Sequence, residues 1–347
     1  MKRIIAVILT LCLLVGLFSA CNKKTAEKQK FSETFIDYFD TVITIVGYEY
    51  TAAEFDAVSE KIEKLTREYH ELYDIYNSYE GKNNIYTINK NAGVEPVKVD
   101  SRIIDLIEFS KDMYDYLEGK TDVTMGALLK LWHNAREKAA LNPASAALPS
   151  KEDISAALSK RGFDKIKLDK AENTVFITES DFSLDVGAVA KGYAAEQIAA
   201  TLEKEGITGY ALSFGGNLRV IGNKPNGERW SAAIDDPLSD STSGSTYLFR
   251  KALVTSGSYQ RYFDLNGVRY HHIIDPDTGY PHIEFASISI MAEDSGLADC
   301  LSTALFSMSL SEGKAFVEKL PDVEVLWIMN DGSREYTKDF FKYALEQ

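Results

Sequence analysis

A carboxylate and a hydroxyl lie four residues apart within the segment 298–306, whose other residues are mostly apolar. Because four residues are about one turn of an α-helix, Asp299 and Thr303 are expected on one face of a helix. Mg²⁺ binds few protein oxygens and completes its shell with water and phosphate oxygens. The pair therefore predicts a magnesium site. A cap or ion pair for Asp299, with Thr303 bonded to a main-chain carbonyl, explains the same pattern equally well.

The segment 184–194 has the residues expected where a strand turns into a helix that binds phosphate. Gly187 lies at the bend, and Lys191 falls in the first helical turn. Helix N-termini attract anions, so a lysine there is unfavourable unless an anion lies nearby. The segment thus favours a phosphorylated ligand over tight packing alone. Glycine turns are also expected over 214–217 and 255–259, and each is weak evidence by itself.

Two histidines, His271 and His272, stand just before an Asp-Pro-Asp-Thr-Gly sequence at 275–279. This sequence imitates the start of a calcium loop, but a glycine replaces the oxygen ligand at the fifth position, and the glutamate required at the twelfth is missing. It therefore predicts a turn. The preceding run, 271–274, predicts a strand whose end can present an imidazole to a cleft.

The composition is that of a folded protein with an acidic surface. The 347 residues include 38 Lys and Arg against 52 Asp and Glu, which gives a net charge of −14, and no Lys/Arg run offers a local basic groove. Nucleic acid is therefore not expected as a partner. The sequence motifs of Rossmann nucleotide sites, P-loops, zincins and serine hydrolases are absent, which removes support for those classes.

The first residues are predicted to direct export. A cationic start, an apolar run over 4–18 and two small residues precede Cys21. The run is shorter than the roughly 20 residues of a membrane-spanning helix, so residues 1–20 are expected to be a signal peptide. The segment ending at Cys21 resembles a bacterial lipobox, from which Phe18 departs because leucine is usual there. An acylated Cys21 and a tether over 21–32 would hold the protein on the outer face of the cytoplasmic membrane; plain secretion is the alternative.

Cysteine usage excludes a disulfide framework. Cys12 and Cys21 lie in or next to the N-terminal apolar segment, which leaves Cys300 alone in the body of the protein. Stability must then come from the core. Cys300 is expected to be a small buried apolar residue and not a nucleophile.

The remainder, residues 33–347, is predicted to be one α+β domain with a largely antiparallel sheet core and flanking helices. A capping-box signature at Thr51 and Glu54 begins an apolar stripe that continues to Tyr76 and predicts a long helix. Further helices are expected at about 102–117, 188–204 and 294–309, with a surface loop over 141–150. Short β-branched and aromatic runs predict strands over 41–46, 174–178, 210–214, 217–221, 230–234, 271–274, 285–291 and 323–329.

Taken in this order, the segments resemble the ApbE family of flavin transferases, the FAD:protein FMN transferases. Eight ordered segments that span nearly the whole mature chain carry the resemblance, and it implies the family's ApbE-like fold. They are 39–41, 77–79, 119–124 with Gly126 and Trp132, 184–194, 215–217, 255–257, 271–281 and 298–306.

The resemblance implies that FAD binds in an extended cleft and is split at its pyrophosphate, with FMN passed to a Thr or Ser hydroxyl of another protein and AMP released. It implies Mg²⁺ on the side chains of Asp299 and Thr303 and the main-chain oxygen of Ala188. Ser302 departs from relatives that carry a third side-chain ligand there, and Asp40 departs without an assigned role. Residues implied to contact FAD are Asp185, Lys191, Phe39, Tyr79, Lys120, Thr121, Asp122 and Ile273.

A hydroxyl nucleophile must lose its proton, and we predict His272, in preference to His271, as the general base. Two other functions remain open: a metal-dependent FAD pyrophosphatase that releases free FMN and AMP, and a lipid-anchored FAD-binding protein without turnover. The acceptors implied by the resemblance are subunits of sodium-pumping NADH:quinone reductase or Rnf-type complexes, or exported reductases, with a D-x-x-S/T-G-A-S/T-like sequence.

Overall fold

The structure is a computed structural model that describes residues 27–239, 242–248 and 251–342. Its centre is a sheet in the order β1-β2-β6-β7-β10-β13-β14-β15, in which every neighbouring pair is antiparallel. This arrangement confirms the predicted α+β class. The predicted signal peptide and Cys21 lie outside the described residues. The strands are β1 (Gln29–Tyr38), β2 (Thr41–Glu49), β6 (Tyr210–Phe214), β7 (Asn217–Ile221), β10 (Ala252–Gly257), β13 (Phe285–Ala292), β14 (Glu324–Met329) and β15 (Arg334–Tyr336).

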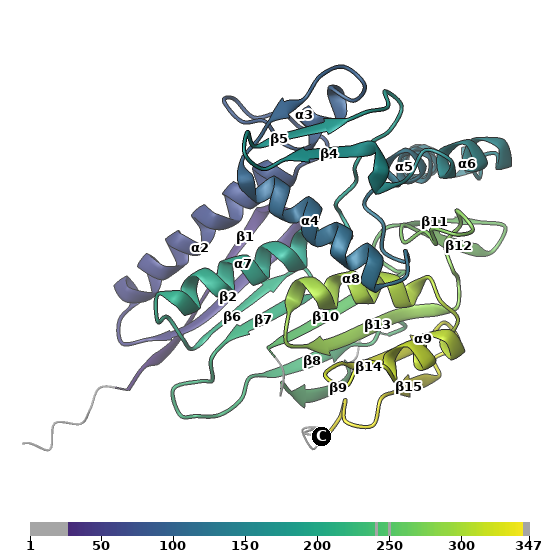
Figure 1. Ribbon diagram of the computed structural model, residues 1–347. Coiled ribbons are helices and arrows are strands. Elements are labelled where there is room, and N and C mark those ends of the chain that lie inside the picture. The colour runs from purple at the N-terminus through teal and green to yellow at the C-terminus, as the bar shows by residue number, and fades with distance from the viewer. Residues whose placement is uncertain (1–26, 240–241, 249–250, 343–347) are drawn as a thin grey trace, which may run out of the picture.

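Helices α2 (Ala52–Tyr73), α7 (Ala190–Lys204) and α8 (Ser295–Phe306) pack on one face of this sheet, and α4 (Ser101–Tyr116) joins them (Figure 1). The capping box predicted at Thr51 and Glu54 is present. The apolar stripe of α2 is buried at Phe55, Ile62 and Tyr69. All four helices predicted from the sequence are therefore confirmed, although α2 ends before the predicted Tyr76.

A two-stranded ribbon covers part of the opposite face of the sheet. It consists of β8 (Ser231–Asp235) and β9 (Thr242–Tyr247). Trp230, Ile234 and Phe340 pack there against Met291 of the sheet. With both faces covered, β13 is buried along its whole length. This burial explains why β13 is a continuous apolar run without the alternation of a half-exposed strand.

A second set of helices and short strands lies above and to the right of α4 in Figure 1. Trp132 donates its Nε1–H to the carbonyl of Gly279 at 2.9 Å, and its ring lies 5.9 Å from that of Tyr270. These contacts hold the 275–279 turn against this group. Its elements are α3 (Ile85–Lys90), β3 (Val97–Lys98), α5 (Gly126–Leu141), η1 (Pro143–Ser145), α6 (Lys151–Leu158), η2 (Phe163–Lys165), β4 (Ile166–Asp169), β5 (Thr174–Ile177), β11 (Tyr262–Leu265) and β12 (Val268–His271).

The tether differs from the prediction over 21–32. Gln29 to Ser32 form the start of β1, where Gln29 pairs with Glu49 and Ser32 with Val46. Main-chain pairing with β2 orders this polar stretch, because an edge strand needs no apolar side chain on its solvent face. The predicted tether can therefore extend no further than residue 28.

Two local predictions near the site had wrong bounds. The glycine turn expected over 255–259 begins only at Ser258, because residues 255–257 belong to β10, where Gly257 pairs with Ser287. The strand expected over 271–274 ends at His271, because β12 loses its partner there. His272 consequently follows the strand in an irregular segment.

Four helices among the described residues were not predicted: α3, α5, α6 and α9 (Leu310–Val317). Helix α5 starts at Met125 without a side-chain cap, so its sequence carries no start signal. The other three have 6 or 8 residues, too few to display a helical period. No helix in the described part of the chain combines the length and apolar character needed to cross a membrane.

Candidate active site

A cavity of about 780 Å³ brings together residues that are far apart in the sequence. Its volume is typical of a small-molecule site. The β1–β2 turn, the end of α2, α5, the residues before β11 and after β12, and α8 contribute to its wall. Of the twelve predicted metal, FAD and catalytic residues, Tyr79 and Thr121 do not line it. Those that do are Phe39, Lys120, Asp122, Asp185, Ala188, Lys191, His272, Ile273, Asp299 and Thr303.

Asp299 and Thr303 lie on α8 and line the cavity together, as the spacing predicted. The Oδ2 atom of Asp299 accepts a hydrogen bond of 2.8 Å from the main-chain N–H of Gly192. Gly192 permits this approach of α7, because a Cβ atom there would lie 2.5 Å from the Cβ of Asp299. No described residue forms an ion pair with Asp299, and burial raises the pKa of its carboxyl. The charge of Lys191 opposes this rise from beyond ion-pair distance without cancelling it, so the buried carboxylate is suited to a bound cation.

The oxygen donors at this position suit Mg²⁺, which needs one or two protein carboxylates and takes its other ligands from water and phosphate. Ala188, whose carbonyl the resemblance implied, lines the same cavity. Ser302 differs. Its hydroxyl lies 2.7 Å from the Oγ of Ser256 and bonds to the carbonyl of Asp299 at 2.9 Å. These bonds direct Ser302 toward β10, so it serves the packing of α8.

The loop before α7 is fixed by side chains at both ends. Asn89 of α3 holds Leu184 with two hydrogen bonds, of 2.9 Å to its carbonyl and 2.7 Å from its N–H. The Oδ1 atom of Asp185 then accepts the N–H of Gly187 at 3.0 Å, which forms the predicted bend. Burial raises the pKa of Asp185. Lys191, in the first turn of α7, lines the cavity and forms no ion pair with a described residue.

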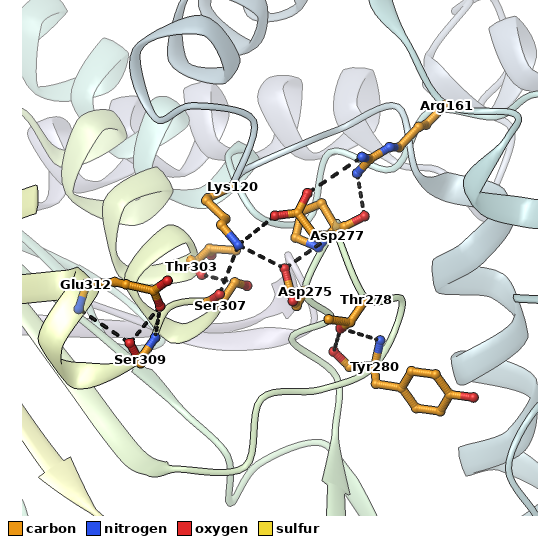
Figure 2. A network of polar contacts seen from close by, with 11 residues as sticks. Lys120, Arg161, Asp275, Asp277, Thr278, Tyr280, Thr303, Ser307, Ser309 and Glu312 are labelled. Atoms are coloured by element: carbon orange, nitrogen blue, oxygen red, sulfur yellow. Dashed lines mark hydrogen bonds and ion pairs between the residues drawn. The ribbon is translucent and has the colours of Figure 1, made fainter. Parts of the chain in front are cut away.

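The Lys120 ammonium contacts three oxygen-bearing residues, as Figure 2 shows. Its Nζ atom lies 3.2 Å from Oδ1 of Asp275, 2.8 Å from Oδ2 of Asp277 and 3.3 Å from the carbonyl oxygen of Ser307. Arg161 approaches Asp277 from the other side at 3.8 Å. We name these five residues the Lys120 clasp. Because Ser307 caps α8, the clasp fixes the turn after the histidines relative to the helix of Asp299.

The two residues after Lys120 have different surroundings. The hydroxyl of Thr121 donates to the carbonyl of Cys300 at 2.7 Å, away from the cavity. The Oδ1 atom of Asp122 accepts two hydrogen bonds from Thr124, whereas its buried Oδ2 atom has no partner among the described residues. Burial raises the pKa of Asp122. Asp122 is therefore the ligand-facing member of this segment. Cys300 is buried, as predicted.

The adjacent histidines differ in their hydrogen bonds. Both ring nitrogens of His271 are engaged: Nε2–H donates to the carbonyl of His282 at 2.9 Å, and Nδ1 accepts the N–H of Ile273 at 3.2 Å. The Nδ1 atom of His272 is buried without a partner among the described residues, and the side chain lines the cavity. Burial, then the charge of Arg261, lowers the pKa of His272 to about 3. His272 is thus a neutral imidazole at pH 7 with an open nitrogen.

An aromatic wall of the cavity is built on residues that the sequence analysis missed. The main-chain N–H of Phe39 donates to Nδ1 of His70 at 3.2 Å, and the two rings lie 5.6 Å apart. The Nε2–H of His70 then faces the hydroxyl of Tyr79 at 3.1 Å, and Tyr79 donates to Asp74 at 2.7 Å. Tyr79 therefore supports the wall from behind. The spacing of His70 and Asp74, four residues apart at the end of a long helix, is the signal that could have indicated them.

The turn that carries Phe39 is itself unusual. Phe39 and Asp40 are the two residues between β1 and β2, and both have positive φ, 55° and 51°. Two-residue hairpin loops favour such backbone angles, but glycine and asparagine usually occupy them. A phenylalanine in this conformation is strained, and strain of this kind is concentrated at functional sites.

Two arginines also line the cavity and were not predicted, Arg136 of α5 and Arg261 before β11. The Nη2 atom of Arg136 donates to Nδ1 of His133 at 2.9 Å. The ion pairs that the structure gives these arginines, to Glu137 and Asp40, are both 3.9 Å long. Burial, and then the neighbouring Arg261, lower the pKa of Arg136. Nothing in the sequence marks Arg261, because only the fold brings it to the cavity.

An antiparallel α+β protein that places a carboxylate–hydroxyl pair, an unpaired lysine at a helix start and a neutral histidine around one cavity has the equipment of a phosphoryl-transfer enzyme. Comparison with known proteins makes this class specific. The family model described as the ApbE family matches residues 39–327. The chain belongs to the ApbE family, which confirms the resemblance seen in its sequence.

Individual relatives agree. An FAD:protein FMN transferase of Treponema pallidum is 32% identical over 260 residues, which cover 70% of this chain and 70% of the relative. One of Klebsiella pneumoniae is 28% identical over 276 residues, 79% of this chain and 82% of the relative. The ApbE protein of Thermotoga maritima, known from a crystal structure, is 29% identical in sequence. Its structure aligns with a TM-score of 0.79 over 92% of this chain and 100% of that chain. The flavin transferase ApbE of Vibrio cholerae, 24% identical, shares the fold with a TM-score of 0.73.

Proposed function

We propose that this protein is an FAD:protein FMN transferase that moves FMN from FAD to a Thr or Ser hydroxyl of an acceptor protein. The hydroxyl oxygen attacks the phosphorus of the FMN half, the bond from this phosphorus to the bridging oxygen breaks, and AMP leaves. The hydroxyl proton passes to a base of the enzyme. Membership of the ApbE family supports the activity, and the Asp299–Thr303 pair beside Lys191 is the observation that carries it.

Phosphoryl transfer needs mainly positioning and neutralisation of phosphate charge. We propose that the FAD diphosphate lies at the start of α7, where main-chain N–H groups and the Lys191 ammonium meet negative charge. Asp299, Thr303 and the carbonyl of Ala188 would hold Mg²⁺, which supplies neutralisation of charge on the phosphate oxygens when bound. Phe39 and Ile273 offer apolar surface to the ring systems of FAD.

We assign proton removal to His272. Its pKa of about 3 would make it a weak base in the ligand-free protein. The cations that lower this pKa include Lys191, whose charge a bound diphosphate would offset. The pKa of His272 should therefore rise when FAD binds, toward the range in which an imidazole is an effective general base.

The direct test is to incubate the protein with FAD and Mg²⁺, with and without an acceptor protein. We expect flavin fluorescence that remains on the acceptor after denaturation, one AMP released per flavin attached, and FMN mass added to one Thr or Ser. Omission of Mg²⁺ with a chelator should abolish the signal. An acceptor that stays unlabelled while AMP is released would replace this proposal with FAD hydrolysis. Stoichiometric FAD without AMP would replace it with a binding protein.

The acceptors are proposed on the family resemblance alone. We propose exported or membrane-associated flavoproteins, such as subunits of sodium-pumping NADH:quinone reductase or Rnf-type complexes, with a D-x-x-S/T-G-A-S/T-like sequence. Replacing the last Ser or Thr of that sequence by Ala in the acceptor should remove the label. Labelling that persists at another residue would contradict this choice of sequence.

We also propose that Cys21 is acylated and holds the protein on the outer face of the cytoplasmic membrane. The lipobox-like segment supports this location, and β1 begins at Gln29, so the tether would be short. The enzyme would then act near the membrane. Mass spectrometry of the mature N-terminus should find a lipid on Cys21, and C21A should release the protein from membranes. A mature chain that begins elsewhere without lipid would disprove the anchor.

A further inference from the structure

The fold places Arg261 directly beside His272. The last pair of the β11–β12 ribbon is Tyr262 with His271. Arg261 and His272, the next residue on each segment, both line the cavity beyond the end of the ribbon, and the charge of Arg261 acts on His272. Arg136 reaches the same place from α5. It follows Trp132 by one helical turn, and Trp132 packs on the ribbon through Phe263 and Tyr270. Two guanidinium groups thus flank the proposed base.

No carboxylate of the described residues accepts a hydrogen bond from the N–H groups of these two guanidinium groups. The nearest carboxylates that the structure gives them lie at 3.9 Å, beyond a hydrogen bond. Arginines elsewhere in the described residues are better satisfied: Arg219 bonds to both oxygens of Glu196 at 2.8 Å, and Arg102 bonds to Asp100 and Glu68 at 2.8 Å. An arginine fork matches a carboxylate or phosphate with two parallel hydrogen bonds. The pair therefore lacks the anion that its geometry fits.

Arg261 lies at the open side of the cavity, with its side chain 48% exposed, whereas the Arg136 side chain is 20% exposed and more enclosed. Tyr76, which also lines the cavity, is 54% exposed. In the proposed function, FAD occupies the interior of the cavity with its diphosphate near Lys191. An acceptor protein cannot enter, so its hydroxyl must reach His272 from this open side, and its neighbouring residues then pass Arg261.

We propose that Arg136 and Arg261 form an anion-binding subsite that receives an acidic side chain of the acceptor protein, next to the hydroxyl that takes FMN. This inference rests on the proposed transferase activity and adds the means by which the acceptor is aligned. Because the protein carries a net charge of −14, an acidic acceptor segment is repelled by most of its surface and attracted here.

The test compares R261Q and the double variant R136Q/R261Q with the wild type and with R269Q. Arg269 is a matched control, since it lies on β12 outside the cavity and stacks on Tyr262 at 3.7 Å. We expect the KM for the acceptor to rise about tenfold or more in R261Q, with a smaller change in kcat at saturating acceptor, and an FAD dissociation constant within about twofold of the wild type. R261Q alone keeps the test valid if the double variant folds poorly, because Arg261 is half exposed.

A second arm changes the acceptor. Each Asp or Glu near the modified hydroxyl is replaced by Asn or Gln, and one of these changes should raise the KM of the wild type but not of R261Q. Wild-type labelling with an unchanged acceptor KM in R261Q would overturn this inference alone. A weaker FAD affinity in R261Q with an unchanged acceptor KM would assign the subsite to an FAD phosphate instead. Absence of labelling by the wild type would overturn the proposed function as well.

Discussion

The Lys120 clasp and the cavity wall around His272 lie side by side but differ in how completely their polar groups are satisfied. In the clasp, one ammonium meets two carboxylates and a carbonyl. In the wall, Lys191 has no ion pair with a described residue, and a buried nitrogen of His272 has no hydrogen bond within the described chain. The polar groups of the clasp are satisfied by one another in the folded protein. Polar groups of the wall remain unsatisfied and available to ligands, which lowers the stability of the fold.

The adjacent histidines repeat this difference within two residues. His271 gives both nitrogens to the main chain, whereas His272 keeps one open. Residue type therefore does not distinguish the structural histidine from the proposed catalytic one; the number of unmet hydrogen bonds does. Substitutions in the wall should reduce activity and leave stability intact, and substitutions in the clasp should do the reverse.

The largest effect is expected for D299N. Loss of the buried carboxylate removes the proposed Mg²⁺ ligand, which should reduce the transfer rate by about 10³-fold or more. The midpoint of urea unfolding should not fall, because an unpaired buried charge is lost. D112N on the exposed face of α4 is the matched control. Transfer by D299N within tenfold of the wild type would remove Asp299 from the metal site.

H272A comes next. It should retain FAD binding, measured by quenching of flavin fluorescence, and reduce transfer by about 10²- to 10³-fold, because a general base contributes in this range. Unchanged turnover would remove His272 from this role. H271A should instead lower the unfolding free energy, since two main-chain groups lose their partner.

K191Q is expected to reduce kcat/KM for FAD by about 10²-fold, since it removes one cation aimed at the diphosphate. Its unfolding midpoint should equal that of the wild type within error, because Lys191 has no ion pair within the described chain. A clear loss of stability in K191Q would contradict the contrast between wall and clasp.

K120M should show the opposite balance. It removes the ammonium from the buried Asp275 and leaves the exposed Asp277 with Arg161 alone, so the unfolding free energy should fall by about 1–3 kcal/mol. Transfer should fall by only about tenfold, through a displaced turn. K120R should recover most of the stability. If K120M instead loses FAD affinity without losing stability, Lys120 contacts FAD directly, as the family resemblance implied.

The smallest effect concerns pH. Folded His272 has a pKa of about 3, below the value of 6.5 for an exposed histidine. Between these values the unfolded chain takes up a proton that the folded protein refuses, so acidification destabilises the fold, whereas above pH 6.5 the group contributes nothing. From pH 7.5 to pH 5 this amounts to at most about 2 kcal/mol. Urea unfolding at both pH values should show a smaller fall for H272A than for the wild type; equal falls would refute the shift.

The sequence alone was sufficient for what depends on local spacing. The helix of Asp299 and Thr303, the helix start at Lys191 and five of the eight strands of the central sheet (β2, β6, β7, β13 and β14) follow from periodicity, glycine position and β-branched runs, and the order of the motifs indicated the family. These features are encoded within a few neighbouring residues, so they can be recognised before the chain is folded. Strands β1, β10 and β15 were not predicted.

The tertiary structure decided which side chains keep open contacts. The clasp on Lys120, the turn of Thr121 away from the cavity, the support of Phe39 by His70 and the meeting of Arg136 with Arg261 all join residues distant in the sequence. No local pattern records such pairs, because a hydrogen bond is satisfied or left open only when a distant segment arrives. The chemistry of the site therefore became visible only in the folded chain.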